Sequence, residues 1–197
     1  MTRVDLPSFG SFEELRRVAL ACTRCPLAAT RTQVVFGAGD PHAQLMFVGE
    51  GPGEQEDLTG EPFVGRAGRL LTGLIEGIGL DRDSVYIANV VKCRPPGNRD
   101  PLPFEIESCR GYLEAQLEFV DPAVVVTLGN FATKLLLDTK EGITRLRGRE
   151  LPYREHAVLI PMLHPSAVLR NGGAALAQAR ADFVVAKRAL ARARDGA

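Results

Sequence analysis

The chain has 197 residues, and its 24 basic and 24 acidic side chains give a formal net charge of zero. A chain of this length can bury a hydrophobic core, and we predict one domain spanning residues 1–197. A hydrophobic content of 45% and a charged content of 24% exclude collagen-like, low-complexity and wholly disordered proteins. Because the net charge is zero, an anionic partner must be bound by a local cluster of basic residues.

The sequence also excludes a membrane-spanning helix, because no apolar segment approaches the ~20 residues that a bilayer requires. The N-terminal stretch of residues 1–20 carries Asp5, Glu13 and Glu14, whereas a signal peptide has an apolar segment there. We therefore expect a cytoplasmic protein without a membrane partner.

Helical and strand patterns alternate along the chain. The patterns predict, in order, an N-terminal helical segment within 1–21, a strand at 45–48, a helix at 67–78, a strand at 85–88, a helix at 103–120, a strand at 124–128, a helix at 131–137, a strand at 158–163 and a C-terminal helix within 174–197. Strands that are apolar throughout are typical of a parallel sheet covered on both faces. The predicted fold class is α/β, a three-layer α/β/α sandwich around a four-stranded, mainly parallel sheet.

Glycine and polar residues follow each predicted strand. The four strands lead, in turn, into Gly49-Glu50-Gly51-Pro52-Gly53, Asn89, Gly129-Asn130 and His164-Pro165-Ser166. In open α/β sheets, ligands bind outside the carboxyl ends of the strands. We therefore expect these four segments to converge on one functional site.

The four cysteines, Cys22, Cys25, Cys93 and Cys109, are spaced as C-x2-C and C-x15-C. Disulfides are rare in the cytosol, so this spacing favours a metal centre over a disulfide framework. A zinc ribbon would carry a second short C-x2-C, so an iron-sulfur cluster is favoured over zinc. Four unrelated buried thiols are the remaining alternative. A cluster here would be structural, fastening the N-terminal segment to the loop that follows the second strand.

The glycine-rich segment after the first strand is not a phosphate-binding loop. It lacks both the G-x-x-x-x-G-K-S/T pattern and the G-x-G-x-x-G spacing. Its neighbours Glu50, Glu54, Glu56 and Asp57 would repel a phosphate. Glycines beside a carboxylate suit a neutral planar ligand such as a nucleobase, and a simple strand-to-helix turn is the alternative.

Five stretches of the chain together carry a family pattern. They are C-T-R-C-P-L-A-A-T-R-T-Q-V-V-F-G-A-G from Cys22, V-G-E-G-P-G-E-Q-E-D from Val48, T-G-E-P-F-V-G-R-A-G from Thr59, Y-I-A-N-V-V-K-C-R-P-P-G-N-R from Tyr86 and H-P-S-A-V-L-R from His164. In this order they resemble the family-4 uracil-DNA glycosylases, the iron-sulfur class of the uracil-DNA glycosylase superfamily. The resemblance implies that the four cysteines hold a structural 4Fe-4S cluster.

The resemblance implies an enzyme of base-excision repair. Such an enzyme hydrolyses the N-glycosidic bond of deoxyuridine in single- or double-stranded DNA, releases uracil and leaves an abasic site. A paired base is out of reach, so the enzyme must extrude it into a pocket. We expect a monomer acting on uracil-containing DNA. The alternatives are a non-catalytic iron-sulfur nucleic-acid-binding module and a zinc-stabilised phosphate-binding domain, the latter disfavoured by the acidic loop.

The resemblance also assigns a uracil-binding set. Phe63 is expected to stack on the base, and the Asn89 amide to pair with its O4 and N3 edge. His164 is expected to donate a hydrogen bond to O2 of the departing uracil anion. Gly51 and Pro52 complete the uracil-binding set together with Glu50.

The catalytic carboxylate cannot be assigned by matching, because Gly51 stands where the best-known uracil-DNA glycosylases have an Asp. The reaction passes through an oxocarbenium-like sugar, which a carboxylate can stabilise while it orients water. We prefer Glu50 to Glu56 for this role because Glu50 adjoins Gly51. Expected DNA contacts are Arg94, Arg99, Ser166 and Arg170.

A related branch of the superfamily forms a covalent adduct with DNA through a histidine near the segment between Cys93 and Cys109. The histidines of this chain are His42, His156 and His164, so that segment contains none. We therefore expect turnover without covalent trapping.

Overall fold

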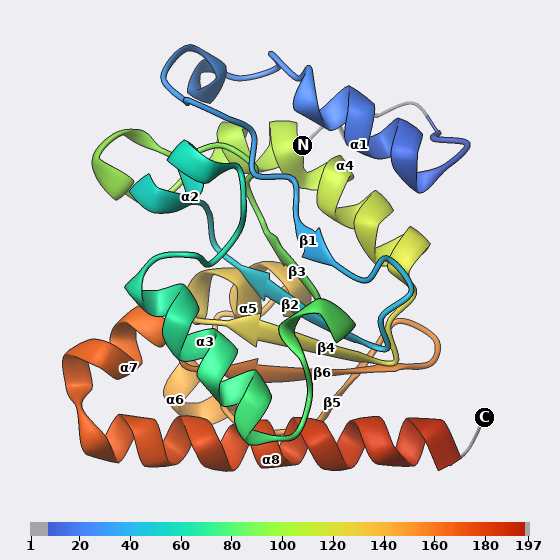
Figure 1. Ribbon diagram of the computed structural model, residues 1–197, viewed down its shortest axis with the longest axis vertical. Helices are drawn as coiled ribbons and strands as arrows, with labels where there is room; N and C mark the ends of the chain where they lie inside the picture. The colour runs from blue at the N-terminus through green and yellow to red at the C-terminus, as the bar shows by residue number, and fades with distance from the viewer. Residues whose placement is uncertain (1–7, 196–197) are drawn as a thin grey trace.

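A computed structural model describes residues 8–195, which form a mixed six-stranded sheet with helices on both faces (Figure 1). The strands lie in the order β1-β3-β2-β4-β6-β5. They are β1 (Ala38–Gly39), β2 (Leu45–Gly49), β3 (Tyr86–Asn89), β4 (Val124–Leu128), β5 (Leu151–Tyr153) and β6 (Ala157–Met162). The four central strands are parallel, and the edge strands β1 and β5 pair antiparallel.

Helices and short turns connect the strands. The α-helices are α1 (Phe12–Leu20), α2 (Glu54–Thr59), α3 (Arg66–Gly77), α4 (Pro103–Val120), α5 (Asn130–Leu137), α6 (Ile143–Leu146), α7 (Pro165–Asn171) and α8 (Gly173–Asp195). Three 3-10 turns are η1 (Pro26–Ala29), η2 (Arg82–Ser84) and η3 (Pro96–Asn98). Among residues 8–195, no helix combines the length and the apolar character needed to cross a membrane.

The central strands supply both halves of the core, because successive side chains of a strand point to opposite faces. Leu45 and Phe47 of β2 pack in the cluster that contains residues of α3 and α8. Met46 and Val48 of the same strand pack in the cluster that contains residues of α1 and α4. These helices cover the two faces of the sheet as separate layers (Figure 1).

The three-layer prediction is confirmed, but the predicted count of four strands is wrong. The structure adds β1 and β5, which are two and three residues long and lie at the sheet edges. Neither contains a buried residue, so no apolar run marks it in the sequence. Pro152 within β5 is tolerated because an edge strand leaves one side without ladder hydrogen bonds.

The predicted helices are found with small shifts of their ends. The N-terminal segment contains α1, whose first turn is capped by the Ser11 side chain accepting from the Glu14 N–H. Residues 1–7 of the predicted N-terminal segment and residues 196–197 of the predicted C-terminal helix lie outside the described part of the chain. The structure adds the short helices α2 and α6, and α7 begins at Pro165, directly after its N-cap His164, as expected for a proline at the first helical position.

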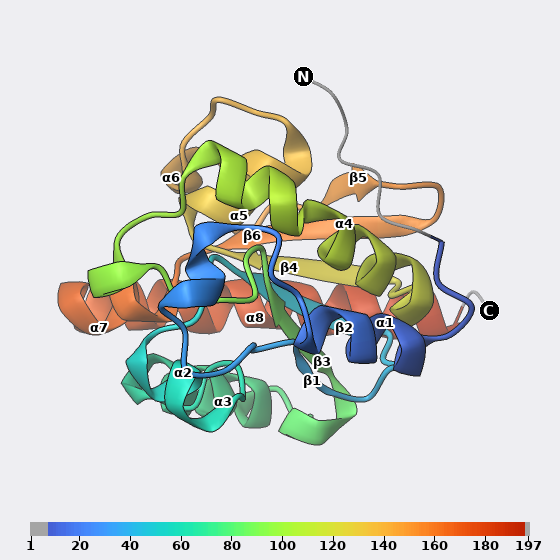
Figure 2. The ribbon, with the colours of Figure 1, turned by 90° about the horizontal axis from the view of Figure 1, so that it is seen from above.

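The carboxyl ends of the parallel strands open toward one end of the molecule. Helix α7 and the loop that precedes α4 lie at this same end of the molecule (Figure 2), and Figure 1 shows them on opposite sides of the strand ends. The segments that follow β2, β3, β4 and β6 therefore surround one space.

Candidate active site

A cavity of about 590 Å³ occupies this end of the sheet. Its walls come from the segments after all four parallel strands, as the sequence predicts. Of the predicted site residues, it is lined by Glu50, Gly51, Pro52, Glu56, Phe63, Asn89, Arg99, His164, Ser166 and Arg170. Arg94 and the four cysteines are not among the lining residues.

Phe63 forms one wall of this cavity and is held in an unusual backbone conformation. Its φ of 53° is left-handed, which costs about 1–3 kcal/mol for a non-glycine residue. Two glycines permit its position: a Cβ at Gly49 would overlap the Phe63 ring, and a Cβ at Gly68 would overlap the Phe63 carbonyl. The ring centroid lies 5.8 Å from that of His164, with an interplanar angle of 37°. The ring is thus fixed as a flat surface next to the imidazole.

Asn89 brings a buried amide to the cavity. It is the last residue of β3, pairs with Gly49 of β2, and is 1% exposed. Its backbone carbonyl accepts a hydrogen bond of 2.7 Å from Lys92 Nζ, whereas its side-chain Oδ1 has no partner among the described residues. A buried acceptor without a partner costs about 1–3 kcal/mol. An N–H group of a bound ligand would remove this cost.

His164 caps α7 with its ring. Nδ1 accepts a hydrogen bond of 3.2 Å from the Ser166 N–H, which places the proton of the neutral ring on Nε2. Burial, and secondarily the nearby Arg170, lower the pKa of His164 from 6.5 to about 4. At neutral pH the imidazole is therefore uncharged, and Nε2–H is a hydrogen-bond donor without an acceptor among residues 8–195.

The two candidate catalytic carboxylates, Glu56 and Glu50, differ in their hydrogen bonding. Glu56 Oε1 accepts from the Val64 and Gly65 N–H groups at 2.9 Å each, and Oε2 accepts from the Gly53 N–H at 3.1 Å. Glu56 thereby caps α2 and fixes the loop that follows Phe63.

The Glu50 carboxylate has no hydrogen-bond or ion-pair partner in the described chain. Burial, and secondarily the negative Asp100, raise the pKa of Glu50 above its ordinary 4.5. Its two oxygens are free to interact with a ligand or with water. The geometry thus favours Glu50 over Glu56 as the carboxylate available for chemistry.

The predicted DNA contacts also divide into two pairs. Ser166 and Arg170 are four residues apart on α7 and line the cavity. Arg99 lines it too, but its guanidinium makes a bidentate pair with Glu105 at 2.7 and 2.9 Å. Arg94 donates to Asn98 Oδ1 at 2.8 Å and pairs with Glu54 at 3.9 Å.

All four cysteines are free thiols; Cys93 and Cys109 are buried, and Cys22 and Cys25 are partly buried. Burial raises the pKa values of Cys25, Cys93 and Cys109, that of Cys109 to about 12. The charge of Cys22 further raises all three values, so the four sulfurs interact electrostatically across 87 residues of sequence. Within residues 8–195, however, no three His, Cys, Asp or Glu side chains are grouped closely enough to hold a single metal ion.

Lys92 is a residue that sequence reasoning missed. It is 2% exposed, and its Nζ donates to the Asn89 carbonyl and to Gln116 Oε1. Its backbone N–H donates to Cys109 Sγ at 3.2 Å. Burial lowers the pKa of Lys92 to about 8, and the thiols of Cys109 and Cys93 oppose that shift. The sequence offers one indication of this: Lys92 lies between the end of a buried strand and a cysteine, where a solvent-exposed lysine is not expected.

The sequence also did not predict the structural contacts of Asp57 and Arg31. The Asp57 carboxylate is 3% exposed and accepts from the Thr32 N–H at 2.9 and 3.0 Å. Arg31 Nη1 in turn lies 3.3 Å from Cys93 Sγ and donates to it. Helix α2, which carries Glu56, is therefore fastened to the segment that follows the first cysteine pair.

Comparison with known proteins agrees with this arrangement. A family profile described as "Uracil DNA glycosylase superfamily" matches residues 36–190. The chain is 51% identical over 151 residues to a type-4 uracil-DNA glycosylase of Thermotoga maritima, an alignment that covers 76% of this chain and 79% of the relative.

Two further relatives carry the same name. The type-4 uracil-DNA glycosylase of Sulfurisphaera tokodaii is 46% identical, with 82% of this chain and 77% of the relative aligned. That of Archaeoglobus fulgidus is 45% identical, with 81% and 83% aligned. The matched residues include the four strand ends that form the cavity, and the chain belongs to the uracil-DNA glycosylase superfamily.

Proposed function

We propose that the chain is a DNA repair glycosylase that hydrolyses the N-glycosidic bond of deoxyuridine in DNA, releasing uracil and leaving an abasic site. The observation that carries this proposal is the cavity, in which an orphaned Asn89 acceptor, a neutral His164 donor and the fixed Phe63 ring meet. These groups match the acceptor, donor and flat-surface requirements of one extruded uracil. The named relatives are uracil-DNA glycosylases of the same type.

Base recognition centres on the Asn89 side chain. Its Oδ1 would accept the N3–H of uracil, and its amide N–H would donate to O4. Cytosine presents an unprotonated N3 and an amino group at these positions, so both contacts would be lost. A pocket that leaves buried polar groups unpaired with the wrong ligand can discriminate strongly. Phe63 would supply stacking worth about 1–3 kcal/mol.

Bond cleavage begins as the bond between the sugar C1′ and uracil N1 breaks and its electron pair moves onto the base. The negative charge develops on O2, where Nε2–H of neutral His164 donates a hydrogen bond. Donors directed at developing charge typically contribute about 3–4 kcal/mol. Because the ring is neutral, its Nε2–H is a very weak acid, so His164 stabilises the uracil anion by hydrogen bonding and keeps its proton.

The sugar becomes oxocarbenium-like, and the free Glu50 carboxylate stabilises its positive charge. Glu50 also orients a water and accepts its proton as the bond between water oxygen and C1′ forms. Proton transfer back to the uracil anion completes the exchange, with water consumed and uracil and an abasic sugar produced. Glu56 is a positioning residue in this proposal, because its oxygens hold the loop that follows Phe63.

We propose further that Cys22, Cys25, Cys93 and Cys109 hold a 4Fe-4S cluster with a structural role. The donor set suits it: all four ligands are thiols, and N–H groups of Lys92 and Arg31 donate to two of the sulfurs. Each thiolate of such a cluster binds a different iron, so the sulfurs need not be as close as around one metal ion. When bound, the cluster would cross-link the segment of Cys22 and Cys25 to the β3–α4 connection through Cys93 and to α4 through Cys109.

The remaining parts of the proposal concern the state of the enzyme. We propose that residues 1–197 act as one domain, as a monomer, and in the cytoplasm, where DNA and free thiols coexist. DNA is bound by Ser166 and Arg170 at the cavity. The segment between Cys93 and Cys109 has no histidine, so the proposed reaction proceeds without a covalent protein-DNA adduct. A protein-DNA band that survives SDS with the wild-type enzyme would contradict this part.

The decisive experiment is uracil release from a labelled single-stranded oligonucleotide with one deoxyuridine, followed by alkaline cleavage. The control is the same oligonucleotide with cytosine at that position. We expect cleavage only at uracil. No cleavage despite DNA binding by cluster-containing protein would overturn the enzymatic proposal and favour a non-catalytic nucleic-acid-binding module.

A further inference from the structure

The rim of the cavity has two sides of different charge. One side is the loop after Cys93, where Arg94 and Arg99 stand among Glu54, Asp100 and Glu105. These two cations and three anions give a net charge of −1. The guanidinium of Arg99 is held bidentately by Glu105, and that of Arg94 is bound to Asn98 and Glu54. This side has little free positive charge for a phosphate.

The other side is formed by α3 and α7, which pack against each other. Arg66 and Arg69 lie three residues apart on α3, so their side chains project from neighbouring positions of one helix face. Arg170 projects from α7 and lines the cavity. All three arginines are exposed, and none makes an ion pair or a side-chain hydrogen bond within residues 8–195.

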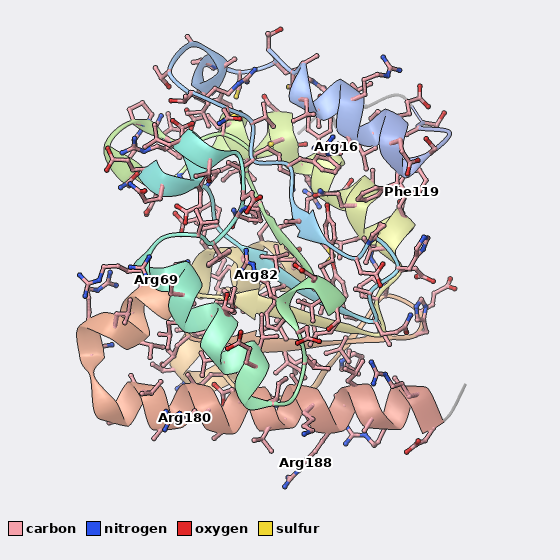
Figure 3. All side chains as sticks on the ribbon, viewed as in Figure 1. Arg16, Arg69, Arg82, Phe119, Arg180 and Arg188 are labelled. Atoms are coloured by element: carbon pink, nitrogen blue, oxygen red, sulfur yellow. The ribbon has the colours of Figure 1, made fainter. Side chains whose placement is uncertain are left out.

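A second hollow continues this side beyond the base cavity. Its volume is about 300 Å³, and Phe63 lies between it and the cavity, lining both. Arg69, Thr72, Gly73 and Glu76 of α3 line the hollow together with Arg82, whose guanidinium donates to Thr72 Oγ1 and to the Pro62 carbonyl. Figure 3 shows Arg69 on the early part of α3, on the side nearer α7. A nucleotide beside the extruded uracil would therefore find a cation and a concave surface here.

We propose that the phosphates of the uracil-containing strand run along this α3–α7 rim, bound by Arg170, Arg66 and Arg69 in that order. This inference rests on the proposed function and deepens it, because it selects one side of the cavity for the DNA backbone. Free arginines bind phosphates by releasing condensed counterions, whereas arginines already paired with carboxylates would first have to break those pairs. In this arrangement Arg94 and Arg99 stabilise the loop after Cys93 and leave the DNA backbone to α3 and α7.

The test is the salt dependence of binding to a fluorescent, uracil-free single-stranded oligonucleotide, measured with the cluster-containing full chain. Each phosphate contact with a single strand contributes about 0.7 to the slope of log affinity against log salt. The double variant Arg66→Ala, Arg69→Ala is expected to lower that slope by about 1.4. When salt is raised from 50 to 200 mM, both proteins lose affinity for the oligonucleotide. The factor by which the variant's affinity falls would be about sevenfold smaller than the factor for the wild type.

The matched control is the double variant Arg180→Ala, Arg188→Ala. Both arginines are exposed and project outward from α8 (Figure 3). We expect the wild-type slope from this control and from Arg94→Ala. The double variant Arg66→Ala, Arg69→Ala is called the α3 variant. An unchanged salt slope for the α3 variant, or a lowered slope for Arg94→Ala instead, would overturn the proposed path of the phosphates along the α3–α7 rim.

Failure of the path is distinguishable from failure of the proposed function, because the probe contains no uracil. Uracil release by the wild type with an unchanged slope for the α3 variant would remove only the path. A lowered slope without uracil release would keep the DNA-binding rim and remove the glycosylase. For an active enzyme, the α3 variant is expected to raise KM for the uracil substrate rather than to lower kcat.

Discussion

The cavity that contains Asn89 and the region around Cys93 and Cys109 are neighbours, yet they differ in hydrogen bonding. Polar side chains in the cavity lack partners within the described part of the chain, whereas those around the cysteines have them. In the cavity, Asn89 Oδ1, His164 Nε2–H and the Glu50 carboxylate lack partners among residues 8–195. Around the cysteines, buried polar groups are paired: Lys92 with Gln116, and Glu105 with Arg99. Unpaired buried groups cost stability and are retained where a ligand completes them. The paired groups around the cysteines stabilise the backbone segments that position the unpaired groups of the cavity.

Two carboxylates close to each other in the sequence show the same contrast. Glu50 is free and its pKa is raised by burial, whereas Glu56 is bonded to three backbone N–H groups. Substitution of a free group should alter chemistry and leave stability intact. Substitution of a bonded group should lower stability and alter chemistry only indirectly.

The largest effect is expected for Glu50→Gln. Loss of a carboxylate that activates water typically lowers the rate by about 10²–10⁴-fold. The carboxylate must be ionised to act, and its pKa is raised above 4.5, so the wild-type rate should fall as pH decreases through that raised value. Single-turnover rates against pH should show this acid limb in the wild type and not in Glu50→Gln.

His164 does not produce that limb, because the imidazole stays neutral down to about pH 4. An acid limb of unchanged position and amplitude in Glu50→Gln would contradict the assignment. The free energy of unfolding at neutral pH, measured by denaturant titration, should be no lower for this variant than for the wild type, because Gln removes a buried charge that disfavours folding.

The next effect is that of His164→Ala. Removal of one donor to a developing oxyanion typically lowers kcat by about 10²–10³-fold. We expect this loss in the single-turnover rate at saturating enzyme, with DNA affinity close to that of the wild type. Equal single-turnover rates for variant and wild type would remove His164 from the reaction.

Lys92→Met tests the connection between the two regions. The change removes the ammonium and leaves the Asn89 carbonyl and Gln116 Oε1 without this donor. One buried acceptor without a partner costs about 1–3 kcal/mol, so the free energy of unfolding should fall by at least that amount. Because β3 then loses the contact that holds Asn89, discrimination between uracil and cytosine should also decrease. A variant with lowered stability but wild-type discrimination would limit Lys92 to a structural role.

The smallest effect is expected for Glu56→Gln. Hydrogen bonds to a charged group contribute about 1.5–3 kcal/mol, and the amide retains one accepting oxygen. Chemical denaturation should therefore show a loss of about 1–2 kcal/mol, and the single-turnover rate should fall by less than tenfold. If Glu56→Gln lowers the rate more than Glu50→Gln, the roles of the two carboxylates are reversed.

Much of the fold was predictable because its central strands are largely apolar and its long helices have clear periodicity. The strands containing Phe47, Ile87, Val126 and Ile160 are buried on both faces, so their sequences are apolar at nearly every position, with the buried polar residues Asn89 and Thr127 as exceptions. Strands β1 and β5 and helices α2 and α6 are too short to carry a pattern. The two strands form because β3 and β6 supply their hydrogen-bond partners.

The site was predictable to the extent that chain order implies it. Parallel strands place their carboxyl ends at one edge, so the sequence alone determined that Glu50, Asn89 and His164 share a cavity, and the motifs around them determined the family. Only the tertiary structure decided which groups are free and which are bonded. Glu56 and Glu50 are the same residue type six positions apart, and Arg99 and Arg66 are both arginines at the rim. The partners of Glu56 and Arg99 lie three to nine residues away in the sequence. The folded path of the chain decides which side chain is turned toward such a partner, and residue type and spacing do not show it.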